Sequence, residues 1–151
     1  MPPHNPSVSQ KTVLFLCTGN SCRSQVAEAI VNRELADSWQ AFSAGTRPTG
    51  FIHPLALQVL TEIGIDHQGS SKNASEFTDQ DFDLVVTVCD SAQEDCPVWL
   101  RANPQVHLSF EDPAAYQGDE ESKLAKFRQV RDEITKKIPE LLARFGSAKS
   151  S

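Results

Sequence analysis

The sequence predicts an α/β fold, a doubly wound four-stranded parallel sheet in the order 2-1-3-4 with helices on both faces. The uninterrupted apolar run Val13–Leu16 is typical of a strand that is buried on both faces of a parallel sheet, and Leu84–Val88 is the strongest strand pattern after it. Segments with a helical spacing of apolar residues alternate with the strands, as in successive βαβ units. The order of the strands is taken from the common flavodoxin-like arrangement.

The first helix and the second strand follow the first apolar run. Apolar residues recur at helical spacing from Val26 to Val31, and this spacing predicts a helix over 24–35. The residues at 40–44 indicate a short strand that ends before Gly45.

A second helix is predicted to begin at His53-Pro54, because proline suits the first turn of a helix, and to end near Gly64. One short helix is expected near 75–82, within the polar segment that follows. The second long apolar run is the third strand, and 105–110 forms a fourth, weaker strand.

The last helix is predicted to begin near Asp119 and to bury one stripe of side chains. The stripe consists of Leu124, Phe127, Arg131, Ile134, Ile138, Leu141 and Phe145. Pro139 is expected to kink this helix. The elements form a single domain, 12–145, between a disordered proline-rich leader, 1–11, and a flexible tail, 146–151.

Length and charge argue against several classes of function. The chain has 151 residues and a net charge of −6, which disfavours binding to nucleic acid or to an anionic membrane surface. No apolar run approaches membrane-spanning length, and the first residues lack the basic and apolar regions of a secretory signal. We therefore expect a cytoplasmic protein, and a monomer.

The four cysteines point to chemistry more than to structure. In a chain without an export signal, Cys17, Cys22, Cys89 and Cys96 favour a catalytic or redox use over a disulfide framework. They contain no C-x-x-C pair, and the histidines fall at no zinc-ligand spacing. We expect no metal site.

The segment between the first strand and the first helix has the composition of an oxyanion-binding loop. Cys17 is followed six positions later by Arg23, and backbone N–H groups in such a turn converge on one point at a helix N-terminus. Arg23 can bind two oxygens of an anion with its planar fork. The residues expected to hold the anion are Thr18, Gly19, Asn20, Ser21, Cys22 and Arg23.

The anion would lie directly over the sulfur of Cys17, and the same field favours a thiolate there. A core cysteine before an ordinary capped helix is the simpler alternative, and the composition of the loop argues against it. Cys89 lies at the end of the third strand, next to the first in the assumed order. Adjacent strands are about 4.8 Å apart, close to the Cα separation that a disulfide requires. Cys89 could equally be a core residue.

Several motifs resemble those of the low-molecular-weight protein tyrosine phosphatase superfamily and, within it, of the thioredoxin-coupled arsenate reductases. The motifs are Cys-Thr-Gly-Asn-Ser-Cys-Arg-Ser-Gln at 17–25, Phe-Ser-Ala-Gly at 42–45, Asp-Leu-Val-Val-Thr-Val-Cys at 83–89, Cys-Pro at 96–97, Phe-Glu-Asp-Pro at 110–113 and Phe-Arg-Gln-Val-Arg-Asp-Glu-Ile at 127–134. The resemblance covers about 12–145. Two features depart from the phosphatases: Gln25 replaces their usual proline, and their Tyr-rich stretch is absent apart from Tyr116.

The resemblance implies reduction of arsenate to arsenite. Cys17 would attack arsenic, Asp112 would protonate the departing oxygen, and Ser24 would hydrogen-bond the thiolate. Cys89 would then attack the adduct on Cys17 and release arsenite, and Cys96 would attack Cys89. The final Cys89–Cys96 disulfide would be reduced by thioredoxin, or by glutaredoxin, with no bound cofactor.

The resemblance also implies a support for the loop. Some arsenate reductases of this family hold potassium beside the anion loop. Asn20, Glu28 and Ser43 match three of its ligands, and Ser70 can stand for the threonine among them. The aspartate of that ligand set corresponds to Lys72, if one residue is deleted nearby. We therefore expect the ammonium of Lys72 to brace the loop in place of potassium, with a solvated surface lysine as the alternative.

Two rival functions remain open. A phosphomonoester hydrolase would use the same Cys17, Arg23 and Asp112, and Asp112-Pro113 could also be only a turn. A non-catalytic redox sensor that responds to an oxyanion would use the disulfide as its signal. Cys22 is expected to be structural, with its side chain away from the anion. Arg128 and Arg131 are expected to lie on a solvated helix face, not on a docking patch.

Overall fold

The computed structural model describes residues 10–90, 92, 96–97 and 100–150. Its long elements follow in an alternating order. They are β1 Lys11–Cys17, α1 Arg23–Glu34, β2 Trp39–Gly45, α2 Pro54–Glu62, β3 Leu84–Thr87, β4 Gln105–His107 and α4 Glu120–Ser150. Three 3₁₀ helices lie between them, η1 Ala74–Phe77, η2 Leu100–Ala102 and η3 Pro113–Ala115.

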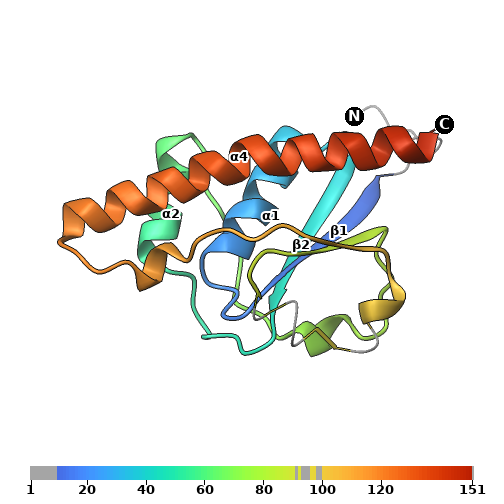
Figure 1. Cartoon of the computed structure of the whole chain (residues 1–151), viewed down its shortest axis with the longest axis horizontal. Coiled ribbons are helices and arrows are strands. Elements are labelled where there is room, and N and C mark those ends of the chain that lie inside the picture. The colour runs from blue at the N-terminus through green and yellow to red at the C-terminus, as the bar shows by residue number, and fades with distance from the viewer. Residues whose placement is uncertain (1–9, 91, 93–95, 98–99, 151) are drawn as a thin grey trace.

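The four strands form one parallel sheet in the order β2-β1-β3-β4, so the predicted order is confirmed. Cys17 pairs with Gly45 at the last register position of β1 and β2. Leu16 pairs with Thr87, and Thr87 with His107, so the carboxyl ends of all four strands lie at the same end of the sheet. Figure 1 shows α1, α2 and α4 on one side of this sheet and the short helices η1 and η2 on the other.

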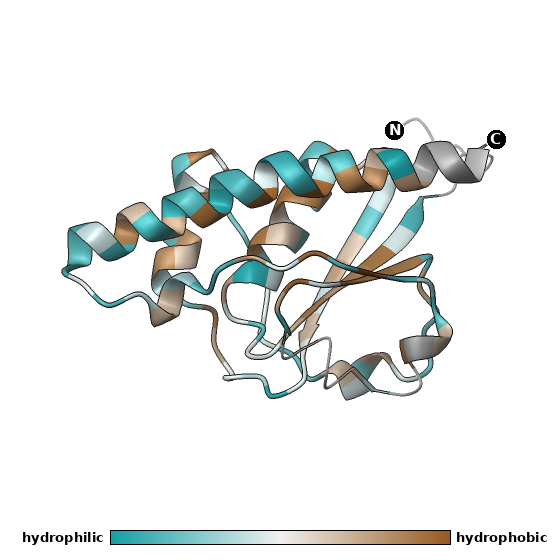
Figure 2. Cartoon of the chain, in the orientation of Figure 1, coloured by the Kyte–Doolittle hydropathy of each residue, from teal (hydrophilic) through white to brown (hydrophobic). Residues whose placement is uncertain are grey.

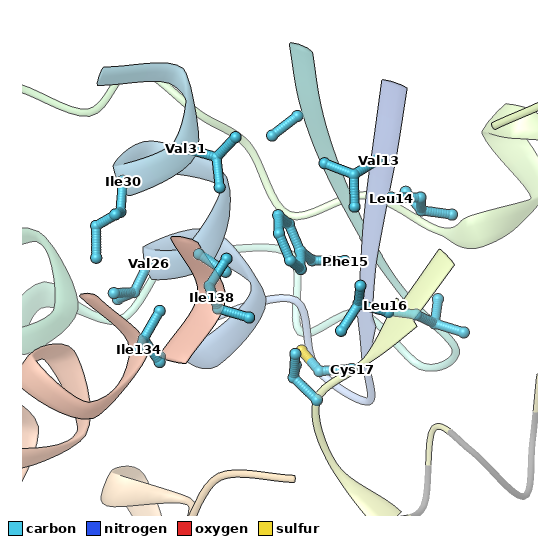
Figure 3. Packing of buried hydrophobic residues seen from close by; sticks show 14 of the residues in the cluster. Val13, Leu14, Phe15, Leu16, Cys17, Val26, Ile30, Val31, Ile134 and Ile138 are labelled. Atoms are coloured by element: carbon cyan, nitrogen blue, oxygen red, sulfur yellow. The ribbon is translucent and has the colours of Figure 1, made fainter. Parts of the chain in front are cut away.

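The core fills both faces of β1, which explains its uninterrupted apolar run. In Figure 3, Phe15 points toward α1, while Leu14 points to the opposite side. On the opposite side, the rings of Phe42, Phe77 and Phe82 pack edge to face, with centroids 5.6 to 5.8 Å apart. Figure 2 shows the hydrophobic colour gathered in the strands, while the outer side of α4 is largely hydrophilic. The strands whose ends carry the site are therefore packed by buried side chains on both faces.

Three boundaries differ from the predictions. The leader was predicted to extend to 11, but β1 already begins at Lys11, whose N–H bonds the carbonyl of Ser38; residues 1–9 lie outside the described part of the chain. β3 and β4 end earlier than expected. Hydrogen bonds from Val88 N–H to Leu16 O and from Phe110 N–H to Val88 O continue the pairing less regularly into the loops that carry the site.

Helix α4 runs past the expected start of the tail, because its backbone stays helical to Ser150. Pro139 lies inside the helix and does not end it, since Ile134, Ile138 and Leu142 anchor it to the core on both sides. Gly146 costs only about 1 kcal/mol in a helix, which its good helix-forming neighbours can tolerate. The helix expected at 75–82 is the shorter η1, capped by Asn73 and Glu76.

Arg128 and Arg131 hold α4 against α2. Both guanidinium groups bind the carboxylate of Glu62, at 2.6 and 2.9 Å, and Arg131 also donates to the carbonyl of Val59. The side chain of Arg131 is only 11% exposed. The expected solvated face is therefore wrong for Arg131. Among the described helices, none combines the length and the apolar character needed to cross a membrane.

Candidate active site

The loop between β1 and α1 curls around the sulfur of Cys17, which Figure 3 places at the end of β1. Asn20 has φ of 49°, a left-handed conformation that asparagine adopts more readily than most residues. This turn aims the N–H of Asn20 at Cys17 Sγ, 3.2 Å away. Ser24 Oγ lies 2.8 Å from the same sulfur. Ser24 Oγ also accepts from the side-chain amide of Asn20, and toward a thiolate at Cys17 its hydroxyl can only donate. Two donors thus stabilise a negative sulfur.

The glycine at 45 lets the second strand approach this loop. A Cβ on Gly45 would lie 2.4 Å from the carbonyl oxygen of Thr18, which is shorter than any real contact. Only glycine allows β2 to pass so close beneath the loop.

A buried amide network supports the loop from behind. Gln25, fully buried, donates from Nε2 to Asn20 Oδ1, at 3.0 Å, and to the carbonyls of Asn20 and Ser70. Its Oε1 lies 2.7 Å from His67 Nε2, and because an amide oxygen only accepts, that nitrogen carries a hydrogen. Burial lowers the pKa of His67, the charge of Lys72 lowers it further, and Glu28 opposes both. His67 was missed in the sequence, since nothing local links it to a residue 42 positions earlier.

The expected loop-support residues come together. Ser43 Oγ donates to Glu28 Oε1 at 2.7 Å, and Lys72 Nζ lies 3.9 Å from the same oxygen. The backbone N–H of Lys72 donates to Asn20 Oδ1, and its Nζ donates to the carbonyl of Ser70, both at 2.7 Å. The Lys72 side chain is 19% exposed, unlike a solvated surface lysine.

Arg23 and Asp112 form a wall beside the sulfur. Arg23 Nη1 donates to the carbonyl of Phe110 at 3.0 Å, and its Nη2 lies 3.8 Å from Asp112 Oδ2. The other carboxylate oxygen of Asp112 caps η3 by accepting from Ala114 N–H. These contacts fix the guanidinium and leave the Asp112 carboxylate 41% exposed.

A cavity of about 210 Å³ opens over the sulfur. It is lined by Cys17, Gly19, Ser21, Cys22, Arg23, Thr49, Phe51, His53, Asp112 and Ala114. We expected Cys22 to face away from the anion, but it lines this cavity. Burial, with the charges of Asp112 and Cys17, raises the pKa of the Cys22 thiol to about 12. Cys22 therefore stays protonated near neutral pH. Thr49, Phe51 and His53 were not identified from the sequence as parts of this site.

A second cavity, of about 570 Å³, lies on the other side of the Arg23–Asp112 wall. Its lining residues are Thr18, Arg23, Cys89, Asp90, Ser109, Phe110, Glu111 and Asp112. Cys89 Sγ lies 3.4 Å from Thr18 Oγ1, so a second thiol sits against the anion loop. Arg23 and Asp112 face both cavities.

The residue after Cys89 is tied to β4. Asp90 Oδ1 accepts from His107 Nε2 at 2.9 Å, which leaves His107 Nδ1 to accept from Thr87 Oγ1 at 2.7 Å. Hydrogen bonds from His107 and then Ser109 lower the pKa of Asp90. Neither Asp90 nor His107 carried a signal in the sequence.

Cys96 is buried near the start of β4. Its sulfur contacts Gln105 Nε2 at 3.7 Å, and Gln105 pairs with Val85, four residues before Cys89 on β3. No disulfide joins any two of Cys17, Cys22, Cys89 and Cys96, so a Cys89–Cys96 bond requires the two sulfurs to approach each other.

His53 joins the cavity to α2 and α4. Its Nδ1 accepts from Leu55 N–H at 3.1 Å and so caps α2, while its ring packs on Phe127 with centroids 4.7 Å apart. Burial lowers the pKa of His53, which Asp112 opposes and Lys123 reinforces. Among the described residues, no group of three or more His, Cys, Asp or Glu side chains could hold a metal ion.

Comparisons with known proteins agree with this geometry. Residues 12–151 match the family model of the low molecular weight phosphotyrosine protein phosphatases. An arsenate reductase from Halalkalibacterium halodurans is 44% identical over 135 residues, 87% of this chain and 94% of that protein. A solved arsenate reductase in the phosphate-binding state is 27% identical, with a TM-score of 0.72 over 89% of this chain and 98% of that one. A low molecular weight protein tyrosine phosphatase from T. tengcongensis is 26% identical, with a TM-score of 0.72 over 89% and 99%. The chain therefore belongs to the low molecular weight phosphotyrosine protein phosphatase family.

Proposed function

We propose that this protein reduces arsenate to arsenite with three of its cysteines and draws its electrons from thioredoxin. The observation that carries this proposal is the thiol of Cys89, 3.4 Å from Thr18 Oγ1 in the anion loop. A hydrolase needs only Cys17, Arg23 and an acid, whereas a reductase needs a second thiol within reach of the first. The relatives named arsenate reductase support the same choice.

The first step is a displacement at arsenic. Arsenate binds in the cavity over Cys17, and the Arg23 fork with the loop N–H groups neutralises its charge. The Cys17 thiolate forms an S–As bond, and one arsenate oxygen leaves as water after it takes a proton from Asp112. Arsenic remains As(V) in this adduct.

The second step transfers two electrons. The Cys89 thiolate attacks Cys17 Sγ, an S–S bond forms and the S–As bond breaks. The electron pair of the broken bond stays on arsenic, which leaves as arsenite, As(III). Cys17 and Cys89 together supply the two electrons and are oxidised to a disulfide.

The third step frees Cys17 for the next turnover. The Cys96 thiolate attacks Cys89 Sγ, which releases Cys17 as a thiolate and leaves a Cys89–Cys96 disulfide. A dithiol reductant then reduces that disulfide by exchange. Because the Cys96 sulfur is held against the side chain of Gln105, this step needs that sulfur to move to Cys89.

The loop that binds the anion is braced by Lys72 and not by potassium. Its ammonium lies 3.9 Å from the Glu28 carboxylate, and its backbone N–H holds the side chain of Asn20. A potassium ion beside the same carboxylate would be repelled by this fixed charge. We also propose that the protein is a cytoplasmic monomer, because a mechanism that cycles thiols suits a compartment in which the cell keeps them reduced.

The test is arsenate-dependent oxidation of NADPH in the presence of thioredoxin and thioredoxin reductase. We expect sustained turnover, and no turnover in Cys17→Ser. Parallel assays with glutaredoxin and glutathione, and with p-nitrophenyl phosphate, separate the other reductant and the phosphatase. Hydrolysis without any arsenate reduction would overturn the proposal in favour of the phosphomonoesterase. One oxidation per molecule with neither activity would favour the redox sensor.

A further inference from the structure

His53 is the N-cap residue of α2, a position that a small polar side chain ordinarily fills. Ser, Thr, Asp and Asn are the preferred caps, because a short side-chain oxygen reaches the first free N–H groups. Here the ring nitrogen Nδ1 accepts the hydrogen bond from Leu55 N–H in place of such an oxygen. The ring extends beyond what capping requires, and the residue lines the cavity over Cys17.

The cap also fixes the tautomer of the ring. Since Nδ1 accepts a hydrogen bond, the hydrogen of the neutral ring is on Nε2. Phe127 packs against the ring, 4.7 Å between centroids, and limits its rotation. No described residue forms a hydrogen bond with Nε2. A held N–H donor thus remains at the wall of an anion cavity.

The charges around the ring keep it neutral near pH 7. Burial is the main cause that lowers the pKa of His53, and Lys123 on α4 acts in the same direction. Asp112 is the opposing charge, and Arg23 lines the same cavity. A neutral ring suits this place, because it can donate a hydrogen bond without pairing with Asp112 and weakening that residue as an acid.

We propose that His53 contacts the substrate, with its Nε2–H donating a hydrogen bond to an oxygen of the bound tetrahedral oxyanion. It faces the anion from α2, whereas the loop N–H groups and Arg23 hold it from β1 and α1. The inference deepens the proposed function, on which it rests for the presence of an oxyanion in this cavity. It adds a donor that belongs to neither the loop nor Arg23.

The two roles of His53 separate by mutation. His53→Asn keeps a side-chain acceptor for Leu55 N–H but lacks the reach of the ring, whereas His53→Ala loses both roles. Asp119→Ala is the matched control, since Asp119 caps α4 through Ser122 N–H and does not line the cavity. It should lower stability and leave anion binding unchanged.

Binding of inorganic phosphate to the reduced protein, measured by calorimetry, needs no turnover. We expect His53→Asn to melt like the unmutated protein and to bind phosphate about tenfold more weakly, or about 1.4 kcal/mol. The KM for arsenate should rise by a similar factor with little change in kcat, because the contact exists before and during the reaction. Unchanged phosphate affinity in His53→Asn would overturn the proposal.

A measurement on the unmutated protein covers the case in which His53→Asn fails to fold. The ¹⁵N resonance of His53 Nε2 should shift on titration with phosphate, with the midpoint that calorimetry gives. No shift at saturating phosphate would also overturn the proposal. Failure of the proposed function looks different, since the protein would then bind phosphate through His53 and yet not reduce arsenate.

Discussion

Gln25 and His67 form a partly buried hydrogen bond, 2.7 Å from Gln25 Oε1 to His67 Nε2, that holds the anion loop from behind. Through Gln25 Nε2 the contact continues to Asn20, and through Asn20 to Ser24 and the sulfur of Cys17. The chain of donors and acceptors is consistent only if His67 donates to Gln25. The position and tautomer of the His67 ring thus bear on a loop that it does not touch.

Stability should fall as the pH falls below 6.5. The pKa of His67 is lowered from its usual 6.5 by burial, so the unfolded state binds a proton more readily than the folded state. The contribution of neutral His67 is fully present above the unfolded value and is lost as the pH falls through 6.5 toward the folded pKa. His53 has the same sign. The check is the urea midpoint at pH 7.5 and 5.5.

His67→Gln is the matched variant for this effect. A glutamine can still donate to Gln25 Oε1 but does not titrate. The fall in the urea midpoint between pH 7.5 and pH 5.5 should therefore be smaller in this variant than in the unmutated protein. An equal loss in both proteins would assign it to other groups.

The cysteines should separate by assay. Cys17→Ser should abolish arsenate reduction and any hydrolysis of aryl phosphate, because both begin with its thiolate. Cys89→Ser or Cys96→Ser should stop multiple turnover but leave hydrolysis, since the first displacement needs neither thiol. Sustained reduction by Cys89→Ser would contradict the three-cysteine relay.

Arg23→Lys should lose most of the activity. Lysine offers a point charge where two oxygens of the anion need a planar fork, and it cannot also hold the Phe110 carbonyl. We expect a loss in kcat/KM of about a hundredfold or more. Arg33→Lys, at a surface contact with the Gly64 carbonyl, is the control. Near-normal turnover in Arg23→Lys would place the anion elsewhere.

Lys72 should make the enzyme indifferent to potassium. Rates in sodium and potassium salts of equal ionic strength should agree, and Lys72→Ala should lower stability or raise KM. Lys72→Asp sets a second carboxylate beside Glu28 with no cation between them, so potassium should stabilise that variant. Activation of the unmutated protein by potassium would show that Lys72 does not replace the ion.

Sequence patterns reveal the strands and the loop because both are local. The unbroken apolar run of β1 and the nearly apolar run of β3 indicate burial on two faces, and the spacing of Cys17 and Arg23 indicates a single turn. The Gln25–His67 contact and the place of Cys96 depend on how distant segments meet, which no local pattern encodes. His53 was hidden differently: with Pro54 after it, the position is fully explained as a helix start.

The two cavities share one partition, made by Arg23 and Asp112. A substitution there alters anion binding on one side and the surroundings of Cys89 on the other. The energetic effects of a mutation in one cavity and a mutation in the other should therefore not be additive when one of them changes Arg23 or Asp112. A change of anion specificity that avoids this coupling would have to come from residues that line only one of the two cavities, such as Thr49 or Ser109.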